Sequence, residues 1–351
     1  MRVLVVNAGS SSLKLRLLGP DDEVERTADI GPGADLDGVV GDWPRPDVVG
    51  HRVVHGGTRF TDPVVIDTGV RKELEGLSAL APLHQPKSLA GLDAVTDLLP
   101  DVPAVACFDT AFHTTIPDAA ATYAVPREWR ERYTLRRYGF HGLSHAWCSA
   151  RVAELTGARR LVTAHLGAGA SLTAVLDGHS VDTTMGFTPL EGLVMATRSG
   201  SVDPGLVLWL EEHEHLSPHE VAETLEKRSG LAALAGTPDM REVLSGAGRG
   251  EPDAVLALDV YVHRLAAGIA AMAAAAGGLE ALAFTGGVGE HASEVRARAA
   301  ERLAFLGVAV DPTRNDTTDG EITLPGALVR TFVVAAREDL EIARGTRAAM
   351  R

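Results

Sequence analysis

Two short stretches with the same layout decide the fold of this chain. Residues 5–18 read VVNAGSSSLKLRLL, and residues 162–178 read VTAHLGAGASLTAVLDG. Each consists of an apolar, β-branched run, a turn of small residues that contains glycine, and a second apolar run, which is the pattern of two strands joined by a short connection. Because one stretch opens the chain and the other lies near its middle, we predict a duplicated unit, each copy of which contains one such hairpin.

Further apolar runs and helical periodicity extend this pattern along the chain. Strands are predicted over 3–6, 13–18, 48–54, 104–108, 160–166, 171–176, 281–286 and 328–334. Helices are predicted over 85–98, 143–155, 203–215, 217–227, 254–276, 291–306 and 337–350. Residues 19–47 and 311–326 are rich in Gly, Pro and Asp and are predicted to be surface loops. The mixture indicates an α/β fold with mixed sheets.

The composition limits the classes of function. The chain has 351 residues, which is long for one core and suits two domains. Its formal net charge is −14 and it lacks any long basic run, which argues against binding of nucleic acid or of an anionic membrane. Cys107 and Cys148 form no CxxC, and neither a leader pattern nor a membrane-spanning apolar run is present. We expect a soluble cytoplasmic protein with small-molecule substrates.

The turn of the first hairpin is suited to binding an anion. Its backbone N–H groups, the hydroxyls of Ser10 and Ser12 and the amine of Lys14 are donors for phosphate oxygens, and the amide oxygen of Asn7 suits Mg²⁺. A polar hairpin with a solvated lysine is the alternative. Two more glycine turns follow strands, HLGAG and FTGGVGEH, and the second opens a helix. Neither a P-loop nor a GxGxxG pattern occurs.

Four residues outside these turns are candidates for chemistry. Arg52 in GHRVVHGG suits anion recognition, and Asp109 in CFDTAFH ends a buried strand. His141 in RRYGFHGLSHAW lies between two glycines, and Arg198 lies in the long glycine-punctuated loop 185–205. The alternatives are a surface ion pair for Arg52, a helix cap for Asp109 and a structural role for His141. GLSHA follows no apolar strand, so we reject a serine hydrolase.

Taken in order, the motifs resemble a known family. The chain resembles the acetate kinases of the sugar-kinase/actin-like ATPase superfamily in NAGSSSLK, GHRVVHGG, APLHQP, FDTAFH, RRYGFHG, HLGAG, VDTTMGFTPLEGL, TRSGSVDPG and TGGVGE. The resemblance implies two duplicated actin-like, ribonuclease H-like α/β domains with a cleft between them. The first would cover 1–110 with 339–351, and the second would cover 111–338.

The resemblance also implies an activity and its reagents. ATP and acetate would be interconverted with ADP and acetyl phosphate by direct in-line transfer. Mg²⁺ would be the metal ion, with Mn²⁺ as the alternative. A homodimer is the assembly that the resemblance implies. In the family, small apolar residues surround the acyl methyl group, and propionate-preferring relatives tend to be smaller at the position of Val54.

Carried over motif by motif, the family's roles fall on specific residues. The metal would be held by Asn7 and Glu338, the transferred phosphoryl group by Ser10, Ser12 and Lys14, and the substrate carboxylate by Arg52. Catalysis would involve Asp109, His141 and Arg198 together with Arg52. The acyl group would be surrounded by Val54, Leu83, Phe140 and Pro189. The nucleotide would be bound by His165, Leu166, Gly167, Ala168, Gly169, Asp239, Met240, Arg241, Gly287, Val288, Gly289, Glu290 and His291.

Elementary chemistry agrees with this set. A carboxylate nucleophile is already ionised at neutral pH, because carboxyl pKa values lie near ~4, so no general base is required to activate it. The difficulty is to bring two anions together while charge spreads over the phosphoryl oxygens, and cations placed there lower the barrier. We therefore expect Asp109 to orient an arginine or a metal-bound water rather than to accept a proton.

The sequence departs from the family pattern at three places, and it leaves alternatives open. Ala168 replaces the asparagine of the usual HLGNG, and the region between residues 18 and 48 is shorter than in typical members. In the C-terminal NEE-type motif, Arg337 replaces the asparagine and Asp339 replaces the second glutamate. The alternatives are a propionate or other short-chain acyl kinase, a hydroxyl-phosphorylating sugar kinase in which Asp109 would be an essential base, and a non-catalytic nucleotide sensor.

Overall fold

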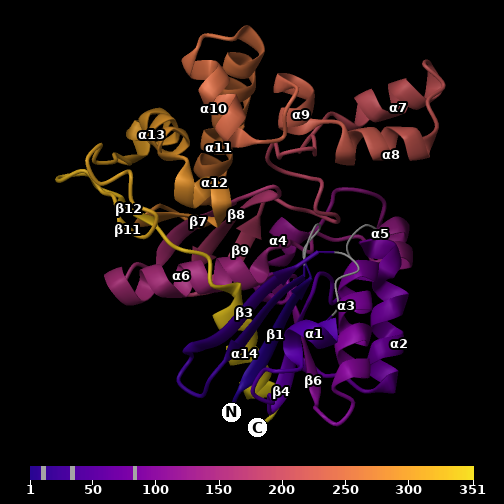
Figure 1. Cartoon of the computed structure of the whole chain (residues 1–351). Helices are drawn as coiled ribbons and strands as arrows, with labels where there is room; N and C mark the ends of the chain where they lie inside the picture. Colours follow the sequence, from indigo (N-terminus) through magenta and orange to yellow (C-terminus); the bar gives the residue numbers. More distant parts are fainter. Residues whose placement is uncertain (9–12, 32–35, 82–84) are drawn as a thin grey trace. The chain divides into compact units, whose positions relative to one another are not determined.

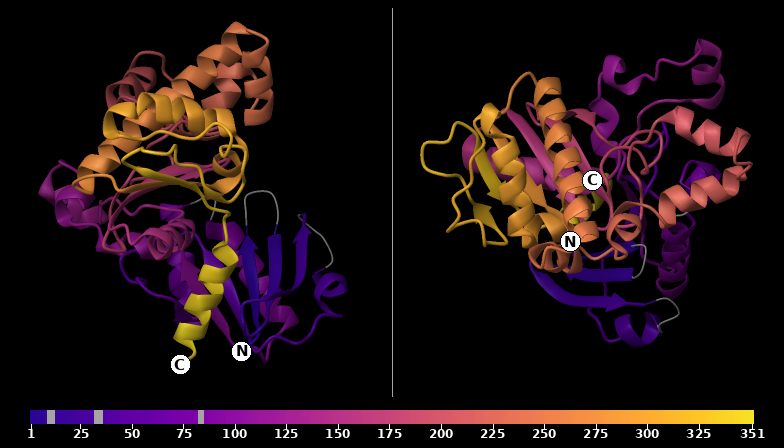
Figure 2. Two further views of the ribbon diagram at one scale, coloured as in Figure 1. Left: turned by 90° about the vertical axis from the view of Figure 1, so that its left-hand side faces the viewer. Right: turned by 90° about the horizontal axis from the view of Figure 1, so that it is seen from above.

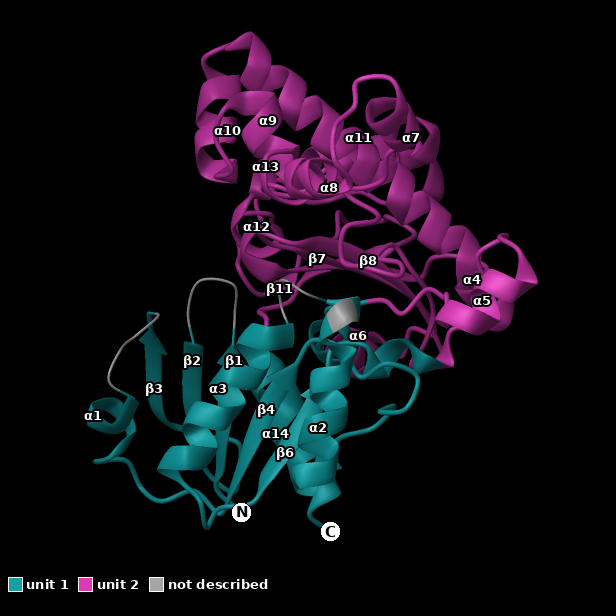
Figure 3. Cartoon of the chain, turned by 90° about the vertical axis from the view of Figure 1, so that its right-hand side faces the viewer, with its two compact units in different colours: residues 1–114, 140–147, 337–351 teal, residues 115–139, 148–336 magenta. Residues whose placement is uncertain are grey.

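The computed structural model describes residues 1–8, 13–31, 36–81 and 85–351, and these residues form two compact units (Figure 3). Unit 1 comprises 1–114, 140–147 and 337–351, and unit 2 comprises 115–139 and 148–336. Each unit contains one six-stranded sheet with helices packed on it, so the predicted α/β class is confirmed. The domain bounds expected from the sequence were 1–110 with 339–351 for the first domain and 111–338 for the second, and these bounds remain a prediction.

The two sheets are built from strands whose bounds largely match the predicted runs (Figure 1). The sheet of unit 1 contains β1 (Val3–Ala8), β2 (Leu13–Leu18), β3 (Val24–Ile30), β4 (Val48–Val53), β5 (Val64–Val65) and β6 (Ala104–Phe108). The sheet of unit 2 contains β7 (Arg160–Leu166), β8 (Ala170–Leu176), β9 (His179–Thr183), β10 (Ala281–Thr285), β11 (Gly320–Glu321) and β12 (Arg330–Val333).

Both sheets have the same topology. The order is β3-β2-β1-β4-β6-β5 in unit 1 and β9-β8-β7-β10-β12-β11 in unit 2. In each, the first three strands form an antiparallel meander, the first strand pairs in parallel with the fourth, the fourth pairs in parallel with the next strand of the order, and a short antiparallel strand closes the edge. The duplication predicted from the two hairpins is therefore confirmed.

Helices cover both faces of the unit 1 sheet. Alternate residues of β1 face opposite ways: Val3 and Val5 pack with Ile342 of α14 (Glu338–Ala349), whereas Leu4 and Val6 pack with Val95 of α3 (Gln85–Leu98). Figure 2 shows α14 in yellow alongside the indigo strands. The helices α1 (Leu36–Val40) and α2 (Thr68–Gly76) complete the α3 side. The strands are thus buried on both faces, which explains why they read as unbroken apolar runs.

Among the described residues, unit 2 contains more helices than unit 1, and one of them is long. The long helix α11 (Pro252–Ala275) packs against β7, β8 and β9 and against α9 (Gly230–Ala235), α10 (Met240–Gly248) and α13 (Ser293–Arg302). Among the described residues, α11 alone has the length and apolar composition of a membrane-spanning helix. A core helix has the same properties, and the buried side chains of α11 recur at helical spacing along its whole length. Unit 2 also contains α4 (Asp118–Ala121), α5 (Arg127–Tyr133), α7 (Pro204–Glu212), α8 (Pro218–Lys227) and α12 (Gly286–His291), and α6 (Gly142–Thr156) begins in unit 1.

The two predicted surface loops contain structure that the sequence did not reveal. Residues 19–47 include the edge strand β3 and the helix α1, and residues 311–326 include β11 and a bridge between Val310 and Thr323. The prediction of loops was wrong there because β3, VERTADI, is half exposed and mixes charged with small residues, so it lacks a periodic apolar pattern. Its position is set by pairing with β2 rather than by burial.

Candidate active site

Three polar residues lie where neighbouring parallel strands of unit 1 end. Asn7 is in β1 one residue beyond the Val6–His51 pair, Arg52 is in β4, and Asp109 follows β6 and donates its backbone N–H to Val53 at 3.1 Å. The carboxyl ends of parallel strands meet at one edge of a sheet, which is where sites form in open α/β folds. Val5 and Cys107, two residues before Asn7 and Asp109, belong to the core under α14. A Cβ on Gly50, two residues before Arg52, would lie 2.9 Å from Ile342 of α14, so all three side chains lie on that face.

Arg52 and Asp109 form a buried ion pair. The Nε of Arg52 lies 3.0 and 3.1 Å from the two carboxylate oxygens of Asp109, and Nη2 lies 2.5 Å from Oδ2. The side chain of Asp109 is 2% exposed and that of Arg52 is 16% exposed. This two-point contact holds the planar guanidinium in one orientation.

Asn7 joins this pair to Glu338, which begins α14. The Oδ1 of Asn7 accepts from Nη1 of Arg52 at 3.2 Å, and its Nδ2 donates to Oε2 of Glu338 at 2.8 Å. Four predicted site residues therefore form one continuous hydrogen-bonded chain, Glu338–Asn7–Arg52–Asp109. Of the five N–H groups of Arg52, three donate within the chain, and one on Nη1 and one on Nη2 have no acceptor among the described residues.

Burial and charge act against each other in this chain. Burial lowers the pKa of Arg52, but the carboxylates of Asp109 and Glu338 outweigh it and leave the pKa above its usual value, so Arg52 stays a cation. Burial raises the pKa of Asp109, against the opposing effect of Arg52. Because both oxygens of Asp109 accept from a permanent cation, the geometry suits an orienting carboxylate rather than a base.

The two departures from the family's C-terminal motif are partners of each other. The guanidinium of Arg337 binds the carboxylate of Asp339 through Nε at 2.9 Å and through Nη2 at 2.9 Å. The side chain of Asp339 is 9% exposed, so it would be costly without a counter-charge. The positive charge of Arg337 is therefore engaged by Asp339, beside the predicted metal ligand Glu338.

A strained turn carries His141 to the same edge. His141 has φ +56°, a left-handed conformation that is uncommon for residues other than glycine. The next residue, Gly142, donates its N–H to the backbone oxygen of Asp109 at 2.8 Å, and a Cβ there would lie 2.2 Å from that oxygen. Only glycine permits this approach, so the HG dipeptide fixes His141 relative to the strand end that carries Asp109.

The described acyl-site residues predicted in unit 1 are buried. Val54 is 6% exposed and Phe140 is 1% exposed. Gln85, a residue that was not singled out from the sequence, accepts from the N–H of His55 at 3.1 Å and donates to its carbonyl at 3.2 Å, which fixes the segment after Val54. Lys14 is exposed and pairs with Asn7 across the β1–β2 hairpin, whereas Ser10, Ser12 and Leu83 lie outside the described residues.

In unit 2, two of the predicted nucleotide segments lie side by side. HLGAG (165–169) ends β7, GVGEH (287–291) follows the parallel neighbour β10, and His165 pairs with Thr285. Gly286 has φ +78° and a Cβ there would lie 2.8 Å from the backbone oxygen of Leu166, so glycine is needed for the two turns to approach. This is the equivalent, in unit 2, of the edge that carries Asn7 and Arg52 in unit 1.

Some predicted nucleotide residues have structural partners in this structure. The carboxylate of Glu290 accepts from the N–H groups of Gly286 and Ala336, each at 3.0 Å, and so ties the start of α12 to the end of unit 2. Asp239 caps α10 through the N–H of Arg241 at 2.9 Å and also pairs with its side chain, which lowers the pKa of Asp239 to about 2.

Arg198 is held within its own loop. Its Nη1 donates to the backbone oxygen of Pro189 at 3.1 Å, so the predicted transition-state arginine and the predicted acyl-site proline of unit 2 are in contact. Burial lowers the pKa of Arg198 although Glu226 opposes this.

Arg296 was missed by reasoning from the sequence. It is 1% exposed and its guanidinium donates to the carbonyls of Gly289 and Glu290 at the end of α12, at 2.8 and 2.9 Å, and to the side chain of Asn315. A signal was present, because Arg296 falls in the apolar stripe of α13 with Val295 and Ala299. A buried cation that binds carbonyls has a fixed position, and here it contacts a predicted nucleotide segment.

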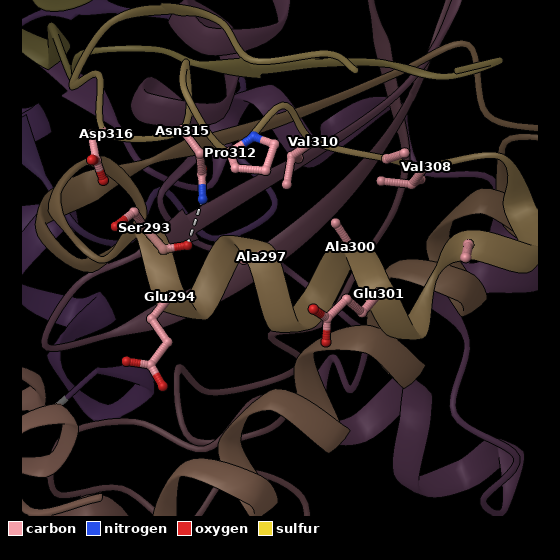
Figure 4. A pocket seen from close by; sticks show the side chains of 12 residues that line it. Ser293, Glu294, Ala297, Ala300, Glu301, Val308, Val310, Pro312, Asn315 and Asp316 are labelled. Atoms are coloured by element: carbon pink, nitrogen blue, oxygen red, sulfur yellow. Dashed lines mark hydrogen bonds between the residues drawn. The ribbon is translucent and has the colours of Figure 1, made fainter. Parts of the chain in front are cut away.

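Asn315 is also one of the residues that line a cavity of about 470 Å³ (Figure 4). It is lined by α13 and by residues 308–316, with Ala297, Ala300 and Val310 on its apolar side, and Asn315 donates to the backbone oxygen of Ser293 at 2.8 Å. None of the predicted site residues lines this cavity, so it is separate from the candidate site.

Comparison with known proteins agrees with the geometry. The sequence profile described as the Acetokinase family matches residues 42–344. An acetate kinase of Nostoc punctiforme is 50% identical, over 85% of this chain and 75% of that protein. A propionate kinase of Francisella tularensis has a TM-score of 0.92 at 35% identity, over 99% of both chains, and an acetate kinase of Porphyromonas gingivalis has a TM-score of 0.89 at 35% identity, over the whole of both chains. The polypeptide that carries the Glu338–Asn7–Arg52–Asp109 hydrogen-bond network therefore belongs to the acetokinase family.

Proposed function

We propose that this chain is an acetate kinase that transfers a phosphoryl group reversibly between ATP and acetate, giving ADP and acetyl phosphate by direct in-line transfer. The observation that carries the proposal is the orientation of Arg52, whose guanidinium is held by Asp109 and Asn7 while two of its N–H groups have no acceptor among the described residues. Two parallel N–H groups of one guanidinium match the two oxygens of a carboxylate.

The proposed chemistry uses cations rather than a base. Acetate is ionised at neutral pH and attacks the γ-phosphorus directly, so a bond forms from the carboxylate oxygen to phosphorus while the bond to the ADP oxygen breaks. Arg52 holds the attacking carboxylate, and Asp109 keeps Arg52 in place. Lys14, Ser10, Ser12, His141 and Arg198 balance the charge on the transferred oxygens, and a single arginine in that role is worth roughly 10³ to 10⁵ in rate.

Magnesium is the proposed metal ion. Mg²⁺ binds few protein ligands, commonly one or two carboxylates, and keeps waters and substrate phosphates for the rest of its shell. The carboxylate of Glu338 would be one such ligand, and the Oδ1 of Asn7, which accepts from Arg52 in this structure, would be the second. The Nδ2 of Asn7 donates to Glu338 at 2.8 Å and so keeps the two side chains together. When bound, the ion would neutralise phosphate charge. Among the described residues no group of three or more His, Cys, Asp and Glu forms a metal cage, which agrees with a site completed by the nucleotide.

The nucleotide is proposed to lie on unit 2. Residues 165–169 lie at the end of β7, and residues 287–291 belong to α12, which follows the parallel neighbour β10. The glycines of these segments have no side chain that would keep phosphate and sugar oxygens away from backbone N–H groups. Residues 239–241, at the start of α10, complete the proposed nucleotide site. Closure of the two domains over the substrates would exclude water from the phosphoryl donor.

Acetate is the proposed substrate. Propionate is the second candidate, because one structural relative is named a propionate kinase. The proposed acyl pocket contains Val54 and Phe140, which are buried and apolar, together with Leu83 and Pro189. A valine at position 54 leaves less room than a smaller residue. One methylene group discriminates by only ~1–3 kcal/mol, so slow turnover of propionate is expected. A sugar kinase would need polar groups here to hold several hydroxyls.

The proposed assembly and location are a homodimer in the cytoplasm. The helix α7 exposes Leu206, Leu208 and Trp209, with 46%, 56% and 46% of their surfaces accessible, and such a group of apolar residues is typical of an interface between protein chains. Sedimentation of the wild type and of a Leu208→Glu, Trp209→Glu double variant would test this: a wild type that sediments as a monomer contradicts the dimer.

The activity is tested by trapping the acyl phosphate with hydroxylamine. Acetate, propionate and butyrate are each supplied with ATP and Mg²⁺, beside Arg52→Ala and Arg198→Ala variants. We expect acetate to be the best substrate, and each variant to lose roughly 10³-fold or more in kcat/KM. No ATP-dependent hydroxamate from any of the three acids would refute the proposed function, and butyrate as the best substrate would refute the acyl pocket.

A further inference from the structure

A half-buried polar cluster in unit 2 supports the loop that carries Arg198. The cluster consists of Tyr123, Arg137 and Glu191. The first two belong to residues 115–139, which precede the sheet of unit 2, whereas Glu191 lies in the loop that follows β9. Arg137 and Glu191 stand in the RRYGFHG and VDTTMGFTPLEGL motifs, but the sequence predicted no role for either of them or for Tyr123.

Arg137 makes contacts that fix the start of the loop. Its Nη1 donates to three successive backbone oxygens, those of Thr183 at 3.1 Å, Thr184 at 3.3 Å and Met185 at 3.2 Å. Its Nη2 donates to Oε1 of Glu191 at 2.9 Å. One rigid guanidinium therefore holds the end of β9 and a side chain further along the loop at the same time.

Glu191 is engaged through its other oxygen as well. Oε2 accepts from the hydroxyl of Tyr123 at 2.7 Å, and the same hydroxyl accepts from the N–H of Phe187 at 2.8 Å. The contacts are close: a Cβ on Gly186 would lie 1.7 Å from Oε2 of Glu191 and 2.1 Å from the hydroxyl of Tyr123. The backbone at 186–187 therefore folds tightly around the carboxylate.

The cluster is only two residues away from the contact of Arg198. Nη1 of Arg198 donates to the backbone oxygen of Pro189 at 3.1 Å. Beyond Glu191, Gly192 donates to the hydroxyl of Ser201 at 3.0 Å and accepts from its N–H at 3.0 Å, which closes the loop around Arg198. Residues on both sides of Pro189 are thus tied down, on one side by Phe187 and on the other by Glu191.

We propose that Glu191, held by Arg137 and Tyr123, is a positioning residue that sets where Pro189 presents its backbone oxygen and hence where the guanidinium of Arg198 lies. The inference rests on the proposed function, because it assigns to Arg198 the stabilisation of the transferred phosphoryl group. Glu191 itself touches no reacting atom. A shift of about 1 Å in such a charge can cost on the order of 10² in rate, so the effect appears in turnover rather than in nucleotide affinity.

The test compares Glu191→Gln with wild type, because glutamine keeps the shape but loses the charge that binds Arg137. We expect kcat to fall at least about tenfold while the KM for ATP stays within about twofold. Asp177→Asn is the matched control: Asp177 pairs with Arg159 at 2.8 Å on the surface of unit 2, and its loss should leave kcat unchanged. An unchanged kcat, or a change confined to the KM for ATP, overturns the proposal.

A double variant separates positioning from general loss of stability. If Glu191 acts through Arg198, adding Glu191→Gln to Arg198→Lys should slow kcat by less than about threefold further, because the position of the altered cation no longer matters. Full additivity of the two losses contradicts the proposal.

Hydrogen exchange provides a readout that does not depend on the reaction. The backbone amides of residues 186–200 should exchange faster in Glu191→Gln than in the wild type or in Asp177→Asn. Unchanged exchange would refute the positioning role of Glu191. If the wild type proves to phosphorylate no short-chain acid while this exchange result holds, the proposed function fails but the structural role of Glu191 stands.

Discussion

The guanidinium of Arg52 donates to both carboxylate oxygens of Asp109, and the Nη2–Oδ2 distance is 2.5 Å. A carboxylate that faces a permanent cation with both oxygens is poorly placed to take a proton from a substrate, but it is well placed to aim that cation. This relationship separates a kinase for carboxylates, which needs an oriented cation, from a kinase for hydroxyl groups, which needs a base.

Asp109→Asn should therefore lower kcat/KM for acetate by on the order of 10² or more, because the amide has one acceptor and no charge to hold Arg52. The pH profile of the remaining activity should keep its shape near neutrality, since no base is removed. The measurement is the hydroxamate rate between pH 6 and 8, with Asp101→Asn, an 85% exposed carboxylate of unit 1, as the control. Retention of most of the activity would end any essential role for Asp109.

Arg52→Lys should be nearly as damaging as Arg52→Ala. A lysine keeps the charge, but it has no planar fork, so it cannot bind Asp109, Asn7 and a substrate carboxylate together. We expect the KM for acetate to rise at least tenfold, about 1.4 kcal/mol, with the KM for ATP little changed. Arg45→Ala, which removes a 68% exposed guanidinium of the same unit, is the matched control. Near-normal acetate kinetics in Arg52→Lys would show that the fork is not needed.

Val54→Ala should move substrate preference toward propionate. The substitution opens space for one more methylene group in the proposed pocket, which corresponds to ~1–3 kcal/mol, or roughly a tenfold or greater change in the ratio of kcat/KM for propionate to that for acetate. The ratio is measured by competition of the two acids in the hydroxamate assay. Val65→Ala, at a 41% exposed position of the same unit, should leave the ratio unchanged. An unaltered ratio in Val54→Ala would remove Val54 from the pocket.

Buried histidines should make unit 1 lose stability in acid. Burial lowers the pKa of His51 to about 3, although Asp93 opposes this, and burial lowers the pKa of His113 to about 4. The unfolded chain takes up protons below about pH 6.5 and the folded one does not, so the free energy of unfolding falls as pH drops from about 6.5 towards these lower values.

Between pH 7 and pH 5, each such histidine contributes a loss of about 2 kcal/mol. His51 is suited to the test because both of its ring nitrogens are buried and have no hydrogen-bond partner among the described residues. In urea unfolding, His51→Leu should show a smaller loss over this range than the wild type. The exposed His179 gives the control, His179→Leu, and an equal loss in wild type and His51→Leu would contradict the assignment.

Arg296→Lys should weaken both unit 2 and the proposed nucleotide segment 287–291. Lysine cannot reach the carbonyls of Gly289 and Glu290 and the side chain of Asn315 at once, and each buried acceptor left unsatisfied costs ~1–3 kcal/mol. We expect a lower midpoint of thermal unfolding and a KM for ATP that rises more than the KM for acetate. Arg298→Lys, two residues on and 39% exposed, is the control. Equal rises of both KM values would contradict a role of Arg296 in supporting the proposed nucleotide site.

Several features of this protein could be predicted from local sequence alone. The hairpins at 3–18 and 160–176, the helices α3, α8 and α14 and the fold class follow from short-range periodicity, because a buried strand or amphipathic helix imprints its repeat on neighbouring residues. Asp109 could be selected as a candidate because it stands at the end of an apolar strand, where functional side chains gather in α/β folds. Arg52 could be selected because GHRVVHGG suits anion recognition.

The partners of these residues are decided only by tertiary structure. Asn7 meets Glu338 across 331 residues of sequence, and Tyr123 meets Glu191 across 68. The strand β3 forms because β2 lies beside it, and the mutual pairing of Arg337 and Asp339 depends on how their side chains turn at the start of α14. A local sequence pattern indicates only whether its own segment is buried. A hydrogen bond between distant residues depends on how the elements pack together, which no short stretch of sequence encodes.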